Sequence, residues 1–139
     1  MNMLDAEAIQ IRRFRASLPE LQHVRRFVGD LVTNHPSADD AVLAASELAA
    51  NAIEHSDSGA FTVQMAHLQD AVRIEVRDAG GSGLPRPGPN GPDATRGRGL
   101  FIVESISRHW GVARDAAHTS VWCEIDCAHA PAVHEYLAA

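Results

Sequence analysis

The stretch Glu47-Leu-Ala-Ala-Asn51-Ala-Ile-Glu-His55-Ser56 decides the fold. Glu47, Asn51 and His55 are spaced four residues apart, and four residues turn an α-helix by only about 40°, so the three side chains form one polar stripe beside an apolar face. An amide in such a stripe can hold a hydrated Mg²⁺, and a carboxylate can accept a proton. The alternative is that Glu47 and Asn51 form a solvated helix edge, and Glu54 is expected to point outward.

The helix that carries this stripe is predicted from Ser37 to Ser56, because Ser37 is a suitable N-cap and Asp40 follows three residues later. The other predicted elements are an edge strand at 9–16, a helix at 20–34, strands at 61–65 and 72–78 with a hairpin tip at 69–70, a loop at 79–96, a helix at 99–109, strands at 111–113 and 119–125, and a closing helix at 131–137. Helices and antiparallel strands are segregated, which predicts an α+β two-layer sandwich in a single domain over residues 1–139.

Asp78 ends the predicted strand at 72–78, and strict alternation places it on the same face as the apolar residues before it. A carboxylate on an apolar face is costly unless a partner satisfies it. The exocyclic amino group of an adenine ring is such a partner. Gly80 and Gly83 then allow the backbone to approach a ligand closely. The alternative is that Asp78 simply caps the following turn.

The stretch Arg96-Gly97-Arg98-Gly99-Leu100 is predicted to open the later helix. Glycines just before a helix expose its N-terminal N–H groups, which can bind an anion, and Arg96 and Arg98 add charge-assisted contacts to phosphate. The alternative is a glycine-rich helix start after a disordered loop. A Walker A loop is excluded because all 12 basic residues of the chain are Arg, and a dinucleotide-binding fingerprint is excluded because its third glycine is missing.

The composition is that of an ordinary soluble domain, with 139 residues, 45% hydrophobic residues and a net charge of −6. That charge argues against nucleic acid as a partner. The acidic N-terminus and the lack of a long apolar run argue against a signal peptide and a membrane span. Cys123 and Cys127 lie about 13 Å apart along one strand, too far for a disulfide, so we expect reduced thiols in a cytoplasmic protein.

The three motifs together resemble those of a known superfamily. Residues 47–56 resemble the N-box of the GHKL ATPases, Val76-Arg-Asp78-Ala-Gly80 resembles their first glycine box, and residues 97–103 resemble their second. The His-Ser end of the N-box, the small size and the strand at 119–122 look most like the anti-sigma factor serine/threonine kinases of bacteria. The resemblance covers about residues 8–127. Ser82 stands where the first glycine box usually has its last glycine, and Gly83 comes one residue later.

The resemblance implies a Bergerat ATP-binding fold, in which a mixed, mostly antiparallel sheet is covered by helices on one face. It implies that Asn51 binds Mg²⁺ and that Glu47 is the general base. Asp78 would bind the adenine amino group, with Thr119 close by, and residues 83–96 would form a mobile lid. The other ATP-binding positions that it implies are Gly80, Gly83, Arg96, Gly97, Arg98, Gly99 and Leu100.

The function implied first is that of a kinase. It would use ATP and Mg²⁺ to phosphorylate an anti-sigma-factor antagonist on serine or threonine, and it would sequester a sigma factor, often as a homodimer. Glu47 favours this interpretation because non-catalytic nucleotide binders can discard the base. The first alternative is an ATP-binding regulatory module that acts by binding only. The second is the ATPase-like domain of a two-component histidine kinase, although no dimerisation helix with a phosphoacceptor histidine precedes the motifs.

Overall fold

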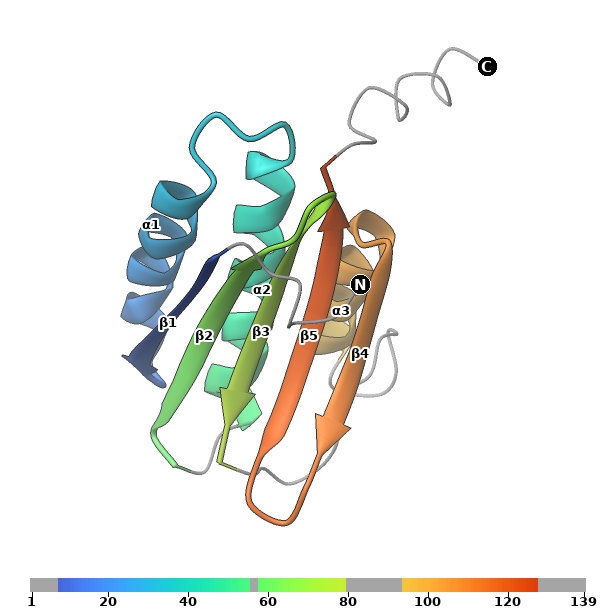
Figure 1. Cartoon of the computed structure of the whole chain (residues 1–139). Coiled ribbons are helices and arrows are strands. Elements are labelled where there is room, and N and C mark those ends of the chain that lie inside the picture. Colours follow the sequence, from blue (N-terminus) through green and yellow to red (C-terminus); the bar gives the residue numbers. More distant parts are fainter. Residues whose placement is uncertain (1–7, 56–57, 80–93, 128–139) are drawn as a thin grey trace.

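The computed structural model describes residues 8–55, 58–79 and 94–127, with the backbone alone for residues 8 and 94–98 (Figure 1). Its strands form one sheet in the order β1-β2-β3-β5-β4, and every neighbouring pair is antiparallel. The elements are β1 (Ala8–Arg15), the 3-10 turn η2 (Leu18–Glu20), α1 (Leu21–Leu31), α2 (Ala38–His55), β2 (Ala60–His67), β3 (Ala71–Asp78), α3 (Ala94–Ile106), β4 (His109–Arg114) and β5 (Thr119–Asp126).

The three helices lie on one face of the sheet and leave the other face uncovered, as Figure 1 shows. This arrangement confirms the predicted α+β two-layer sandwich. The middle helix, α2, contacts β2, β3 and β5 as well as both other helices. Its buried face is rich in small side chains, which let a helix approach a sheet closely; they include Ala41, Ala44, Ala45, Ala49 and Ala52. None of the three helices is both long and apolar enough to cross a membrane.

The central strands β3 and β5 carry the core face of the sheet. The predicted alternation in β3 is confirmed, since Val72, Ile74 and Val76 are buried together with Asp78. Directly opposite these four residues, in the antiparallel register, β5 presents a matching buried row made of Ile125, Cys123, Val121 and Thr119. The buried rows of the two strands therefore end on two polar residues, Asp78 and Thr119.

Two predicted helix boundaries differ from the structure. The helix expected at 99–109 is α3, which runs from Ala94 to Ile106. It ends earlier because His109 and Trp110 pair with Glu124 and Cys123 of β5 and start β4. It begins earlier because packing against α2 offsets the helix cost of its glycines, roughly 1 kcal/mol each.

The helix expected at 20–34 is also shorter in the structure. The η2 turn precedes α1, and α1 ends at Leu31. Asn34 then adopts a φ of 66°, a left-handed conformation that asparagine tolerates better than most residues and that cannot continue a helix. The hairpin tip at 69–70 is confirmed by a hydrogen bond of 2.8 Å from Leu68 N to Ala71 O. The predicted closing helix at 131–137 lies outside the described residues.

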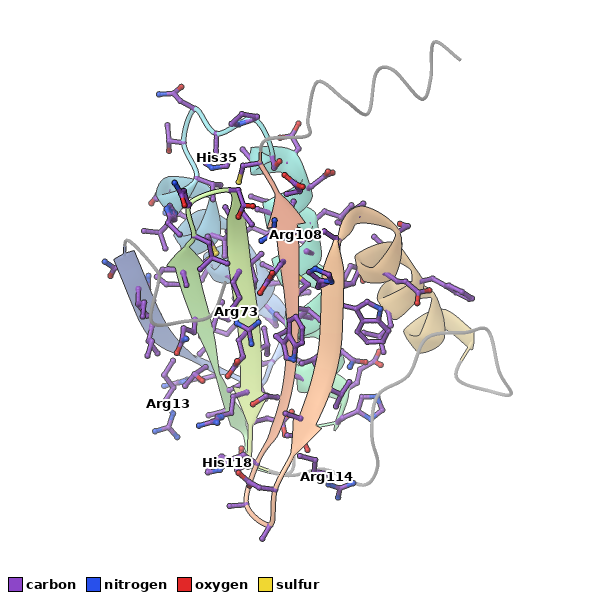
Figure 2. All side chains as sticks on the ribbon, turned by 45° about the vertical axis from the view of Figure 1, so that its right-hand side comes forward. Arg13, His35, Arg73, Arg108, Arg114 and His118 are labelled. Atoms are coloured by element: carbon purple, nitrogen blue, oxygen red, sulfur yellow. The ribbon has the colours of Figure 1, made fainter. Side chains whose placement is uncertain are left out.

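A polar network covers the middle of the uncovered sheet face (Figure 2). The Arg73 guanidinium lies 4.2 Å from the centre of the Trp122 ring and donates to Glu124 Oε2 at 3.2 Å. Arg108 donates to both carboxylate oxygens of Asp70, at 2.9 and 3.1 Å, and to Glu124 Oε1 at 3.4 Å. The buried Glu124 carboxylate is therefore held between two guanidinium groups, which compensates for its loss of water.

The two cysteines are free thiols, as predicted. Burial raises the pKa of Cys123 to about 12 and that of Cys127 to about 11. Both thiols are therefore protonated at neutral pH, and protonated thiols are poor nucleophiles. Cys123 packs within the core, and the partly buried Cys127 packs against it.

The first prediction concerns His35, in the turn between α1 and α2, whose ring centre lies 6.2 Å from that of His67. Burial, and then the nearby His67, lower the pKa of His35 from its usual 6.5. Below about pH 6.5 the unfolded chain therefore binds more protons at this position than the folded chain does. We expect the free energy of unfolding to be highest above about pH 7 and to decrease between about pH 7 and pH 5.

Urea unfolding across this pH range measures the effect. The His35→Gln variant should lose part of the pH dependence, and the His109→Gln variant, which changes an exposed histidine, should keep it. Asp70 does not titrate between pH 7 and pH 5, because its hydrogen bonds with Arg108 lower its pKa from 3.8. An unchanged pH dependence in His35→Gln would contradict this account of the turn.

Candidate nucleotide-binding site

The polar stripe of α2 lies at the inner face of the helix layer. Asn51 is only 8% exposed, Glu47 is half-buried and Glu54 is exposed. The interpretation of Asn51 as part of a solvated helix edge is therefore wrong, whereas the outward position of Glu54 is confirmed. A buried amide on a helix that packs against the sheet needs a polar partner, and this requirement fits a ligand-binding position.

Asp78 and Thr119 form the polar end of the core face. Asp78 is the last residue of β3, Thr119 is the first residue of β5, and the two are direct partners in the antiparallel register. They are 8% and 4% exposed. The Thr119 hydroxyl oxygen is buried and has no hydrogen-bond partner within the described residues. The expected proximity of Thr119 to Asp78 is confirmed, and a group that offers hydrogen bonds at this position would satisfy the hydroxyl.

Helix α3 meets the stripe of α2 at Gly99. A Cβ atom built on Gly99 would lie 2.8 Å from Glu47 Oε2, closer than a real contact allows. Leu100, the next residue, is 2% exposed and anchors α3 in the core. The absence of a side chain at position 99 therefore lets α3 lie directly against the Glu47 carboxylate.

The glycines of this stretch do not precede a helix, contrary to the sequence prediction. Gly97 and Gly99 lie within the first two turns of α3, which begins at Ala94. Their role as a phosphate cradle stays a prediction. The side chains of Arg96 and Arg98 lie outside the described part of the chain, as do Gly80, Gly83 and the segment 80–93 that makes up most of the predicted lid.

Sequence reasoning missed several residues beside the site. Phe61 of β2 is the other register partner of Asp78, so the carboxylate lies in the sheet between an aromatic residue and Thr119. Arg25 Nε of α1 donates to Ser46 Oγ at 3.0 Å, immediately before Glu47, and ties two helices together beside the stripe. A parity count along the strands could have found Phe61, but the Arg25–Ser46 pair depends on tertiary packing.

The arrangement fits a magnesium nucleotide. The end of α2, the end of β3 and the start of β5 lie at the same end of the sheet (Figure 1). A purine ring could satisfy the Thr119 hydroxyl, and the Glu47 carboxylate lies directly against Gly99 of α3. Within the described residues, no group of three His, Cys, Asp or Glu side chains could hold a metal ion. Mg²⁺ in nucleotide sites commonly takes one or two protein ligands together with phosphate oxygens, and the Asn51 amide fits such a role.

Comparison with known proteins agrees with the fold. The family model described as "Histidine kinase-like ATPase domain" matches residues 6–125. A crystal structure of the RsbU and RsbW domains of Rv1364c from Mycobacterium tuberculosis is similar with a TM-score of 0.61 and 18% identity. The match covers 85% of this chain but only 32% of that longer chain, so it shows the shared fold. No curated protein matches this chain significantly.

The family match extends over nearly all of the described residues, and its limits include the polar stripe of α2, the Asp78–Thr119 pair and the glycines of α3. The structural match is consistent with it. The chain therefore belongs to the histidine kinase-like ATPase domain family.

Proposed function

We propose that this domain binds ATP with Mg²⁺ and transfers the terminal phosphoryl group to a serine or threonine of a protein partner. The observation that supports it most is the buried pair of Asp78 and Thr119, in which a hydroxyl that has no hydrogen-bond partner among the described residues lies next to a carboxylate on the apolar face of the sheet. An adenine ring can pack on aliphatic side chains while its edge hydrogen-bonds with polar groups, which suits this surface.

The remaining residues take roles around the phosphates. Asn51 would be a ligand of Mg²⁺, and Gly97 and Gly99 would lie beside the phosphate oxygens in the first two turns of α3. Bound Mg-ATP supplies the phosphoryl group and the neutralising charge. Glu47 would accept the proton of the partner's hydroxyl. The hydroxyl oxygen would then bond to the γ-phosphorus, and the bond between that phosphorus and the bridging oxygen of the leaving ADP would break.

The partner class comes from the sequence resemblance to the anti-sigma factor kinases. The substrate would be an anti-sigma-factor antagonist, and a sigma factor would be the second partner that the domain sequesters. The similarity to a chain that contains RsbU and RsbW domains agrees with a regulatory setting of this kind. A regulator that binds ATP and its partner without phosphoryl transfer is the competing outcome.

The second prediction tests Glu47. Loss of a general base typically lowers the rate by about 10²–10⁴-fold, so Glu47→Ala should reduce transfer by this factor and leave the dissociation constant of ATP within about threefold of the original. Glu54→Ala, which removes an exposed carboxylate from the same helix, is the matched control and should retain full activity.

The assay mixes the purified chain with Mg²⁺, γ-labelled ATP and candidate antagonist proteins, and calorimetry measures ATP binding in parallel. Transfer that survives in Glu47→Ala would remove the general-base role. ATP binding with no transfer from the unaltered chain to any candidate would favour the binding-only regulator.

The third prediction tests Asp78. A hydrogen bond to a charged group contributes about 1.5–3 kcal/mol, so Asp78→Asn should weaken ATP binding by at least about tenfold. The affinity for GTP should change less, because guanine has no amino group at the corresponding ring position. Competition calorimetry with both nucleotides measures the ratio. Asp30→Asn, on the exposed surface of α1, should leave the ratio unchanged, and an unchanged ratio in Asp78→Asn would exclude the adenine contact.

A further inference from the structure

The sheet face that no helix covers is divided by charge into two ends. At the end near the hairpin between β2 and β3, arginines and carboxylates are paired (Figure 2). Arg73 donates to Glu75 at 3.4 Å and to Glu124 at 3.2 Å. Arg108 donates to Asp70 at 2.9 and 3.1 Å. The charges of this end therefore compensate one another.

The opposite end of the same face carries arginines without such partners. A row of successive register partners crosses β1, β2, β3 and β5 there, made of Arg13, Thr62, Arg77 and Ser120. Arg15 lies two residues beyond Arg13 on the same face. The side chains of Arg13, Arg15 and Arg77 are exposed and form no ion pair with a described residue. These three arginines form the basic end of the face.

The polar groups beside the basic end leave its charges available. Arg77 Nε donates to Ser120 Oγ at 3.2 Å, so its two terminal nitrogens have no partner among the described residues. Glu20 accepts a hydrogen bond from the backbone N–H of Arg15 at 3.2 Å, and its other oxygen contacts a histidine of α1. Asp115 accepts two backbone hydrogen bonds within its own hairpin, at 2.8 and 2.7 Å. These bonds lower the pKa of Asp115 most, and Arg77 contributes least.

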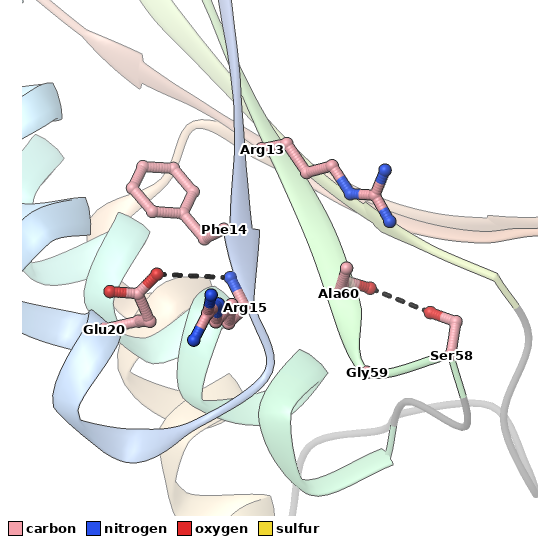
Figure 3. A pocket seen from close by; sticks show the side chains of 7 residues that line it. All are labelled: Arg13, Phe14, Arg15, Glu20, Ser58, Gly59 and Ala60. Atoms are coloured by element: carbon pink, nitrogen blue, oxygen red, sulfur yellow. Dashed lines mark hydrogen bonds between the residues drawn. The ribbon is translucent and has the colours of Figure 1, made fainter.

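Two arginines of the basic end also line a cavity of about 460 Å³ at the start of β2 (Figure 3). Arg13 and Arg15 line it together with Ser58, Gly59 and Ala60, among others. Pockets that bind small ligands have volumes of roughly 300–1,000 Å³, so this cavity can admit an acidic side chain. A guanidinium group binds a carboxylate through two parallel hydrogen bonds, which favours an acidic ligand here.

Two exposed isoleucines continue the uncovered face along β1. Ile9 and Ile11 precede Arg13 at alternate positions, and they are 46% and 61% exposed. Neighbouring large apolar side chains that stay exposed commonly mark a contact surface. Alternate residues of a strand point to the same side and are about 6–7 Å apart. Along β1 the face therefore presents two apolar side chains and then two arginines at this repeat.

We propose that the basic end and the two isoleucines form a docking surface for an acidic, extended segment of another protein. The segment lies along β1 and over β2, with two apolar side chains on the isoleucines and two acidic side chains on the arginines. An extended chain has the same repeat of about 6–7 Å between alternate residues, so both pairs match at once. Arg13 and Arg77 are separated by one strand, about 10 Å between their Cα atoms, and both side chains can bind one carboxylate.

The combination of apolar and basic groups favours a protein segment over a polyanion. Nucleic acids are bound through many basic contacts. Here three arginines stand in a chain of net charge −6, beside two isoleucines and a charge-compensated network. An acidic protein segment supplies carboxylates and aliphatic groups together. The surface lies on the opposite face of the sheet from Glu47 and Asn51 of α2, so docking needs no nucleotide and is tested separately from the proposed function.

The fourth prediction is measured by fluorescence anisotropy with the full chain. The probes are short labelled peptides with two leucines and two glutamates at alternate positions, separated by serines. One peptide has the leucines first and the other has the glutamates first, so that both directions along β1 are covered. At least one should bind with a dissociation constant below about 100 µM. Its affinity should fall as salt is added, because salt screens exposed charges.

Substitutions locate the bound peptide on the surface. Arg13→Glu and Arg77→Glu should each raise the dissociation constant at least about tenfold, because each places like charges in contact. Arg26→Glu, the same charge reversal on the exposed surface of α1, is the matched control and should change it less than about twofold. Ile11→Ser should raise it at least about threefold and leave the salt dependence unchanged. A peptide with lysines in place of the glutamates should bind the Arg13→Glu, Arg77→Glu double variant more tightly than the unaltered chain.

Dissociation constants above about 1 mM for both peptides, or equal losses in Arg13→Glu and Arg26→Glu, would overturn the proposal. Other occupants give distinct results. Self-association of the unaltered chain in sedimentation that Arg13→Glu abolishes would assign the surface to a second copy. Tighter binding of oligothymidine or of phosphatidylserine vesicles than of either peptide, lost in Arg13→Glu, would assign it to a polyanion or a lipid surface. Each of these results would exclude the acidic protein segment.

Discussion

A carboxylate and a hydroxyl are buried side by side where the apolar face of the sheet ends. Asp78 and Thr119 continue two rows of aliphatic side chains, one on β3 and one on β5, and the register of those strands leaves no freedom to turn either residue to the other face. Burial of polar groups on such a face reduces stability unless hydrogen bonds compensate. A ligand that supplies these bonds gains affinity from the same groups, and the rest of the site is arranged around this pair.

The position of α2 next to the sheet follows from its small buried side chains. Its alanine-rich face brings the helix close to the central strands, and the polar stripe at its edge is thereby carried next to the end of the sheet. Gly99 allows α3 to approach Glu47 from the other side. The carboxylate and the amide of α2 and the glycine of α3 thus lie on the helix-covered side of the sheet, as the buried pair does, although α2 and α3 are separate in the sequence.

Local periodicity predicted the parts of the fold that depend on it. The alternation that ends at Asp78 and the four-residue spacing of Glu47 and Asn51 gave the correct faces of a strand and a helix. The start of α3 was wrong because helix propensity disfavours glycine, whereas packing against α2 decides the outcome. Gly111 gave no signal, yet a Cβ there would lie 2.9 Å from the Trp122 ring across the strand pair. Contacts of this kind depend on which strands become neighbours, and composition does not reveal that.

The most direct test of the account is a crystal structure of the full chain with Mg²⁺ and a non-hydrolysable ATP analogue. We expect the purine amino group within hydrogen-bonding distance of the Asp78 carboxylate, the Thr119 hydroxyl bonded to the ligand or to a water that it holds, and the Asn51 amide oxygen in the coordination shell of the metal. An analogue bound elsewhere on the molecule, with Asp78 and Thr119 still covered by the protein's own side chains, would contradict the account.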